Sequence, residues 1–201
     1  MFSKDEYVSL VAAIHGTGCQ PVSDTTNYLA CHYLPNWYPL VSEFTPETKV
    51  YPADCHLAKE LKGLGWSEYF IKDYVKSLKT SVGSRISKPE AVEVVVSEMR
   101  RYRGTIEGGF RVRRVEDFQP DTELRYFVFN GKPRAPIGEV PEIVHQCASR
   151  VKSGFFSADV IQRTDGALRI VEIGDGQVSD LVGWSPQVFS KALAQSFLNW
   201  N

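Results

Sequence analysis

The chain has 201 residues, of which 43% are hydrophobic and 23% are charged, so it can bury a core in one compact body or in two closely packed lobes. A net charge of −1 and a pI near 6.4 exclude a strong overall attraction to nucleic acid or to a membrane surface. The four cysteines are far apart with no Cys-x-x-Cys pair, and the first residues do not resemble a signal peptide or a spanning segment. We therefore expect a cytoplasmic protein.

The first part of the chain contains short elements separated by glycine and proline. Apolar side chains at helical spacing predict a helix over residues 4–14, and a second helix is expected over residues 24–33. Residues 34–39 are aromatic and carry two prolines, which predicts a broken corner. Its rings favour a packed core, and a ligand site is the alternative. A strand at residues 48–51 and a helix at residues 55–64, closed by glycine, are expected next.

A lysine stands in the apolar middle of a strand-like run, residues 69–77. Because the flanks of Lys72 are apolar, we expect it to be buried, and a buried lysine usually binds an anion; an exposed lysine on an edge strand is the alternative. The loop that follows, residues 77–85, is rich in Ser, Thr and Gly and carries cations, which together suit phosphate oxygens. Lys76 and Lys79 also have a simpler interpretation, because loop lysines are usually solvated.

A capping box predicts the next helix. Ser87 stands at the N-cap and Glu90 three residues later, and Ala91, Val94 and Met99 follow at helical spacing. A later strand ends in the Asn130-Gly131 turn signal. The remaining elements are expected as strands over residues 111–118 and 123–129 and as helices over residues 140–151 and 187–198.

Two alternating, β-branched strands flank an Asp-Gly turn within residues 155–181, which predicts a hairpin. Asp159 on the first strand and Glu172 on the second are expected to be cross-strand neighbours. Each has apolar neighbours in sequence, where a carboxylate is costly unless a cation neutralises it. A hard ion such as magnesium would do so, and Asp175 would add another oxygen. An ordinary hairpin with its acids facing solvent remains equally open.

The order of these features resembles the ATP-grasp superfamily. It comprises a strand lysine, a flexible loop, a helix, a strand ending in acids, a Glu-x-Arg strand with a Gly-Lys turn, and the acidic hairpin. The interval between Asp159 and Glu172 is similar to that between the family's two metal-binding acids. The match spans residues 69–181 and is most similar to a little-characterised bacterial and phage clade. It departs at Gly174, where the family usually has asparagine, and Asp175 is the expected substitute.

The resemblance implies ATP and Mg²⁺ as cofactors and assigns roles to individual residues. Glu116 and Asp117 lie where the family's hinge receives adenine through its backbone and ribose through an acid. Arg125 either forms a salt bridge near Glu123 or points at the γ-phosphate, and only the resemblance favours the second role. The loop over residues 77–85 would be a lid that ATP orders. The implied sets are Lys72, Lys76, Lys79, Glu116, Asp117 and Arg125 for the nucleotide, with Lys72 and Arg125 catalytic, and Asp159, Glu172 and Asp175 for the metal.

The resemblance also implies a fold and an activity. We expect an α+β protein of the ATP-grasp type, with two α+β lobes over residues 66–201 and a reduced amino-terminal region over residues 1–65. The implied activity is ATP- and magnesium-dependent ligation of a small-molecule or peptide carboxylate to an amine or other nucleophile through an acylphosphate. The alternatives are a nucleotide-binding module that helps to assemble a protein partner, and a phosphotransferase. The acceptor stays open.

Overall fold

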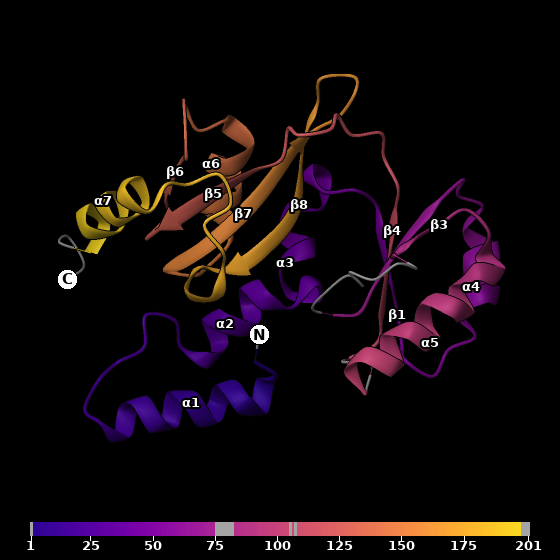
Figure 1. The fold of residues 1–201 in the computed structure, drawn as a ribbon, viewed down its shortest axis with the longest axis horizontal. Helices are drawn as coiled ribbons and strands as arrows, with labels where there is room; N and C mark the ends of the chain where they lie inside the picture. Colours follow the sequence, from indigo (N-terminus) through magenta and orange to yellow (C-terminus); the bar gives the residue numbers. More distant parts are fainter. Residues whose placement is uncertain (1, 75–82, 105, 107, 198–201) are drawn as a thin grey trace. The chain divides into compact units, whose positions relative to one another are not determined.

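The computed structural model describes residues 2–74, 83–104, 106 and 108–197. It divides into two compact units (Figure 1). We call Met1–Phe44 with Phe118–Asn201 the terminal unit, and Thr45–Asp117 the middle unit. Each unit contains helices and one antiparallel sheet, which confirms the α+β expectation. The predicted boundary at residue 65 is a different division, drawn by resemblance, and stays a prediction.

The middle unit is a four-stranded antiparallel sheet with helices over one face. Its strand order is β1 (Thr48–Tyr51), β4 (Phe110–Arg114), β2 (Tyr69–Lys72) and β3 (Arg85–Ile86). The helices are α4 (Leu57–Leu64), which ends at Gly65 in the left-handed conformation as expected, and α5 (Val92–Arg103), preceded by the 3₁₀ turn η2 (Pro89–Ala91).

Strand alternation divides the middle sheet into an apolar face and a cationic face. Tyr69, Ile71 and Val112 belong to a buried core with residues of α4 and α5. Register pairs Lys72 with Arg111, and both therefore lie on the opposite face from that core. This alternation confirms the expected strand and the expected burial of Lys72, which is 6% exposed.

The predicted capping box is wrong. The residue before η2 is Lys88, and no side chain caps either η2 or α5. The helix proper begins only at Val92, so its inward face carries Val92, Val95 and Met99, while Val94 is 55% exposed. Pro89 explains the difference, because it fits the first turn of a helical segment and moves the start of the helix away from Ser87.

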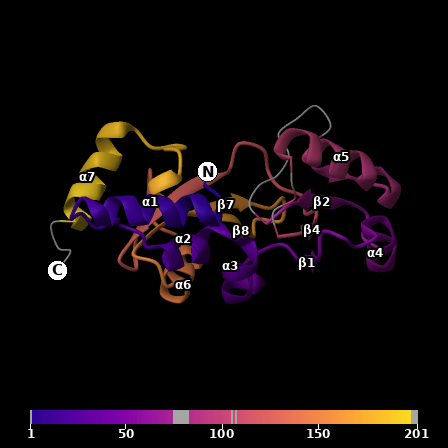
Figure 2. The same cartoon turned by 90° about the horizontal axis from the view of Figure 1, so that it is seen from below.

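The terminal unit contains a second antiparallel sheet, with helices before, between and after its strands along the chain. Its strand order is β6 (Lys132–Arg134), β5 (Leu124–Phe129), β7 (Phe155–Gln162) and β8 (Leu168–Asp175), and the predicted hairpin is β7 and β8. The helices are α1 (Lys4–Gly16), α2 (Thr25–His32), α3 (Leu34–Val41), α6 (Glu142–Arg150) and α7 (Pro186–Phe197); 3₁₀ turns lie at η1 (Ser42–Phe44) and η3 (Gly176–Val178). Helix α2 contacts α1, α3 and β8 (Figure 2).

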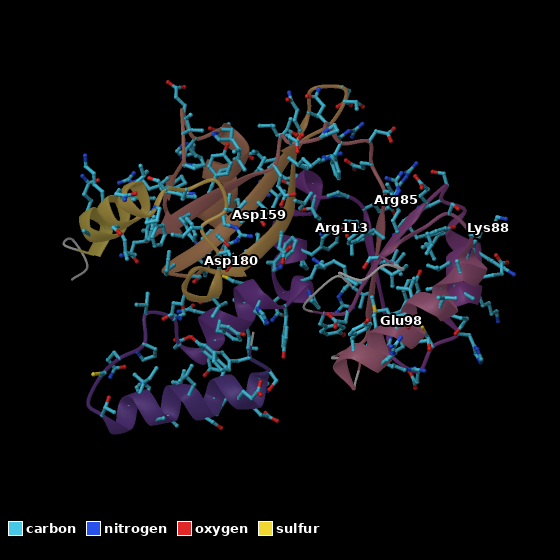
Figure 3. All side chains as sticks on the ribbon, viewed as in Figure 1. Arg85, Lys88, Glu98, Arg113, Asp159 and Asp180 are labelled. Carbon is cyan, nitrogen blue, oxygen red and sulfur yellow. The ribbon has the colours of Figure 1, made fainter. Side chains whose placement is uncertain are left out.

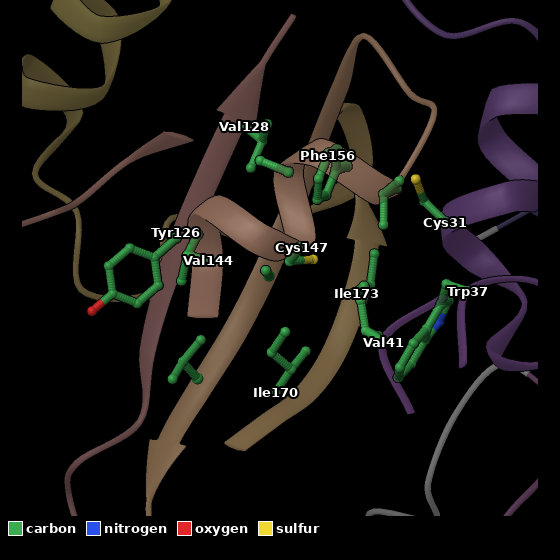
Figure 4. Packing of buried hydrophobic residues seen from close by; sticks show 14 of the residues in the cluster. Cys31, Trp37, Val41, Tyr126, Val128, Val144, Cys147, Phe156, Ile170 and Ile173 are labelled. Carbon is green, nitrogen blue, oxygen red and sulfur yellow. The ribbon is translucent and has the colours of Figure 1, made fainter. Parts of the chain in front are cut away.

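The core of the terminal unit lies on one face of this sheet. Phe156 and Ile173 pack there with Trp37 of α3 and Cys147 of α6 (Figure 4). A register shift between Asp159 and Val160 gives β8 one additional residue. On the other face, Phe127, Phe129, Phe155 and Trp184 form a separate aromatic cluster with α7.

The expected broken corner at residues 34–39 is instead the helix α3. Pro35 stands in its first turn, where a missing N–H costs nothing, and the helix continues through Pro39 to Val41. Trp37 is 1% exposed, so the interpretation of this aromatic run as core is confirmed. Burial of the tryptophan offsets the hydrogen bond that Pro39 cannot make.

Candidate functional site

Three charged side chains form a row across the terminal sheet. Register pairs Arg125 of β5 with Asp159 of β7, and Asp159 with Glu172 of β8, as predicted for the two acids. Because alternate residues point to opposite faces, the row lies on the face away from the Phe156 and Ile173 core. The same register that buries the core therefore brings a cation and two acids together.

Arg125 binds the carboxylate of Asp159 through two parallel hydrogen bonds. Its Nε donates to Oδ1 at 2.7 Å and its Nη2 to Oδ2 at 2.7 Å. The side chains are 15% and 5% exposed. The hydrogen bond to Asp159 is the largest cause that raises the pKa of Arg125, opposed by burial, and the charges of Asp159, Glu172 and Asp180 add to the increase. This fork is a strong, orienting contact.

Two further contacts fix Arg125 on both sides. Its Nη1 donates to the backbone oxygen of Asp180 at 2.8 Å, which brings the loop after β8 over the row (Figure 3). Trp184 donates from Nε1 to the backbone oxygen of Arg125 at 2.8 Å. Sequence reasoning missed Asp180, because a loop residue carries no periodic signal and only its acidic type could have marked it.

The solvent-facing alternative for the hairpin acids is wrong for Asp159, which is 4% exposed. Burial does require a cation near this carboxylate, as expected, and in the structure Arg125 supplies it. Glu172 is half-buried on the neighbouring strand. A metal held here would therefore share Asp159 with Arg125.

Asp175 lies apart from this row. It is separated from Glu172 by an odd number of positions, so it points to the opposite face, and it is 0% exposed. Its Oδ1 accepts from the backbone N–H of Gln177 at 3.0 Å, whereas its Oδ2 has no hydrogen-bond partner among the described residues. Burial raises its pKa, and hydrogen bonding to Ser23 and Gln177 lowers it by less. Within the described ranges, no three His, Cys, Asp or Glu side chains are placed to hold a metal ion.

Gly174 occupies the position on the open face next to Glu172. The hydroxyls of Ser157 and Ser179 lie 2.7 Å apart beside it. A Cβ added to Gly174 would lie 3.3 Å from Ser157 Oγ and 3.2 Å from Ser179 Oγ. The two hydroxyls therefore fill the space that a longer side chain at this position would need.

The remaining predicted residues belong to the middle unit. Lys72 lies at the end of β2, cross-strand from Arg111. Glu116 is half-buried and Asp117 exposed in the irregular segment after β4. Lys76 and Lys79, with most of the predicted lid, lie outside the described residues. Sequence reasoning missed Arg111, although the alternation Arg111-Val112-Arg113 in a strand could have marked a cationic face.

A family model, described as an ATP-grasp domain and numbered as the third family of its clade, matches residues 36–193. The chain belongs to this ATP-grasp family. The match includes the hairpin, the row of charged residues and the cationic strand. No curated protein matches the chain by sequence.

Solved structures show the same ATP-grasp fold. D-alanine-D-alanine ligase from Coxiella burnetii superposes with a TM-score of 0.65 at 15% identity, covering 93% of this chain and 60% of that one. The D-cycloserine synthetase DcsG gives 0.68 at 10% identity, over 96% and 78%. Cdc123 from Schizosaccharomyces pombe gives 0.60 at 14%, over 83% and 92%. This chain thus spans less than two thirds of the first ligase.

The donor set of the terminal unit fits magnesium in one particular way. Magnesium is usually held by one or two carboxylates together with the phosphates of its substrate, not by a cage of protein ligands alone. Asp159 and Glu172, adjacent on one face, meet that requirement. Asp175, on the other face, does not join them. Within the described residues, no helix has both the length and the apolar composition to span a membrane.

Proposed function

We propose that this ATP-grasp protein is an ATP- and magnesium-dependent ligase that joins a carboxylate to an amine or another nucleophile. The observation that carries the proposal is the row Arg125, Asp159 and Glu172 on the open face of the terminal sheet. A guanidinium beside two carboxylates provides both the cation that phosphoryl transfer needs and the oxygens that a magnesium ion needs. The family membership supports ATP as the phosphoryl donor.

The reaction proceeds in two steps. An acceptor carboxylate attacks the γ-phosphorus of ATP, the bond to the bridging oxygen breaks, and an acylphosphate and ADP form. An amine then attacks the acyl carbon, and inorganic phosphate leaves with the amide formed. Lys72 and Arg125 offset negative charge during phosphoryl transfer. No protein residue forms a covalent intermediate.

Magnesium, when bound, would neutralise charge on the β- and γ-phosphates, held by Asp159 and Glu172. Asp175 enters this proposal only through the sequence. Arg125 keeps Asp159 ionised and oriented, so its role is to hold the ligand as well as to meet the phosphoryl group. Both roles use the same face of one sheet.

The nucleotide is proposed to use the middle unit as well. By resemblance, backbone groups near Glu116 and Asp117 receive adenine and an acid there receives ribose. Lys72, Lys76 and Lys79 are assigned to the phosphates on the same basis. Residues 1–65 are proposed as a reduced amino-terminal region, and the cytoplasm as the compartment. The acceptor and the amine are small molecules or peptides.

The test is acylphosphate capture. Purified protein is incubated with ATP, magnesium and a panel of carboxylates, each with hydroxylamine, which converts an acylphosphate to a stable hydroxamate. The ligase proposal predicts ADP and hydroxamate in equal amounts with at least one acid, and amide when a true amine replaces hydroxylamine. A stable phosphorylated product that does not react with hydroxylamine would instead indicate a phosphotransferase.

A nucleotide-binding module that assists protein assembly is the second candidate. Two observations favour it. Gly174 removes the side chain that the family uses as a metal ligand, and the two serine hydroxyls fill its place. Arg125 already neutralises Asp159. Tight ATP binding without turnover across the acid panel would support this candidate over the ligase.

A further inference from the structure

Arg111 is a buried arginine with two hydrogen-bond donors that no described residue accepts. It lies on β4 in the middle unit and is 0% exposed. Its Nη1 donates to the backbone oxygen of its own neighbour, Phe110, at 2.9 Å. Its Nε and Nη2 have no hydrogen-bond partner in the part of the chain that the structure describes. Buried polar groups are nearly always hydrogen-bonded, so this edge of the guanidinium requires an explanation.

No acid offsets the charge of Arg111 among the described residues that shift its pKa. Burial lowers that pKa, and Tyr74 offsets part of the decrease. The guanidinium carbon lies 3.5 Å from the centroid of the Tyr74 ring, a cation–π contact. Such a contact attracts the cation but satisfies neither N–H edge atom. A buried charge in this state is costly unless an anion joins it.

The surroundings hold the guanidinium in place. A Cβ added to Gly108, whose φ is +71°, would lie 2.3 Å from the Tyr74 ring, so the ring packs directly on this glycine. Tyr74 in turn contacts the guanidinium of Arg111. Lys72 faces Arg111 across the strand pair. The result is a positioned donor edge beside a second cation.

Arg125 shows within the same protein what this edge can bind. It uses Nε and Nη2 to hold both oxygens of Asp159. Arg111 presents the same two atoms without a partner among the described residues. Two oxygens of one phosphate match this spacing as a carboxylate does, and the neighbouring Lys72 favours the more highly charged group.

We infer that Arg111 binds a phosphate group of the nucleotide, with Nε and Nη2 donating to two of its oxygens beside Lys72. The inference rests on the proposed function for the identity of the ligand. Arg111 is here a binding and positioning residue, which fixes the phosphate chain relative to the middle sheet. Its contact with phosphate would satisfy both buried donors at once.

The experiment compares Arg111→Met with a matched control, Arg114→Met, which removes an exposed arginine from the same strand. Calorimetry measures the Kd of each variant and of the wild type for ATP with magnesium, for adenosine and for inorganic tripolyphosphate. We expect Arg111→Met to weaken ATP by about 10- to 100-fold, as loss of a charged hydrogen-bonding partner does, without weakening adenosine. The control should bind all three ligands as the wild type does.

Thermal unfolding without ligand keeps the test independent of folding. If Arg111 serves a ligand, methionine in its place leaves the unfolding midpoint unchanged or higher, because a buried charge is removed. A lower midpoint with equal losses for ATP and adenosine would overturn the inference, as would unchanged ATP binding. Wild-type binding of tripolyphosphate but not ATP, lost in Arg111→Met, would contradict the proposed function and support the phosphate site. Wild-type binding of neither would overturn both.

Discussion

Asp159 is neutralised by Arg125, and this pair determines how the acidic hairpin behaves. Both side chains are largely buried, and two hydrogen bonds of 2.7 Å join them. In such a pair the desolvation cost is offset only while both partners remain, so removal of one leaves a buried charge. The pair is thus a fixed element of the site and not an exposed ion pair.

The first prediction concerns this pair. Arg125→Met should lower the free energy of unfolding by about 3–5 kcal/mol, because Asp159 is then buried without a partner. The double variant Arg125→Met with Asp159→Leu should recover most of that loss. Urea unfolding of both variants is the measurement. A loss below about 1 kcal/mol in the single variant would mean that the pair behaves as an exposed salt bridge.

A second prediction concerns Lys72, which is 6% exposed at the end of β2 on the cationic face. Lys72→Ala should weaken ATP by at least about tenfold, the effect of one lost charged contact, and leave adenosine unchanged. Lys62→Ala, on the exposed surface of α4, serves as the control. Parallel losses for ATP and adenosine would show that Lys72 supports the fold instead of binding phosphate.

At the scale of elements, local patterns predicted most strands and helices but not their caps. The alternation of β7 and β8 and their Asp-Gly turn placed Asp159 opposite Glu172 correctly. The same period of two places Asp175 on the other face from Glu172, which the prediction of a third ligand overlooked. Helix α3 was missed because proline signals outweighed the tertiary packing of Trp37, which no local pattern contains.

The third prediction tests the packing of the hairpin at Gly174. Gly174→Asn should destabilise the protein by about 1–3 kcal/mol, because its side chain would overlap the space of the Ser157 and Ser179 hydroxyls. Adding Ser179→Ala should recover part of the loss. Thermal unfolding of the single and double variants is the measurement, with Gly138→Asn, in open space, as a reference. Equal stability of Gly174→Asn and the wild type would show that the hydroxyls move aside freely.

At the scale of the whole molecule, the family was predictable from the order of motifs, and the site only in part. The two acids of the hairpin are close in sequence, so their pairing follows from local rules. The Arg125–Asp159 contact joins strands that are far apart in the chain, and the Arg111–Lys72 pair depends on the order of strands in the middle sheet. Such contacts follow from register between distant strands, which composition and spacing do not determine.

The central claim is that Asp159 and Glu172 hold magnesium together with ATP. Calorimetry of ATP binding with magnesium and with a chelator tests it directly, in the wild type and in Glu172→Gln. We predict that ATP affinity depends on magnesium in the wild type, that Glu172→Gln loses at least about tenfold of this dependence, and that its unfolding midpoint stays close to the wild type. Equal ATP affinity with and without magnesium, or full magnesium dependence in Glu172→Gln, would contradict the account.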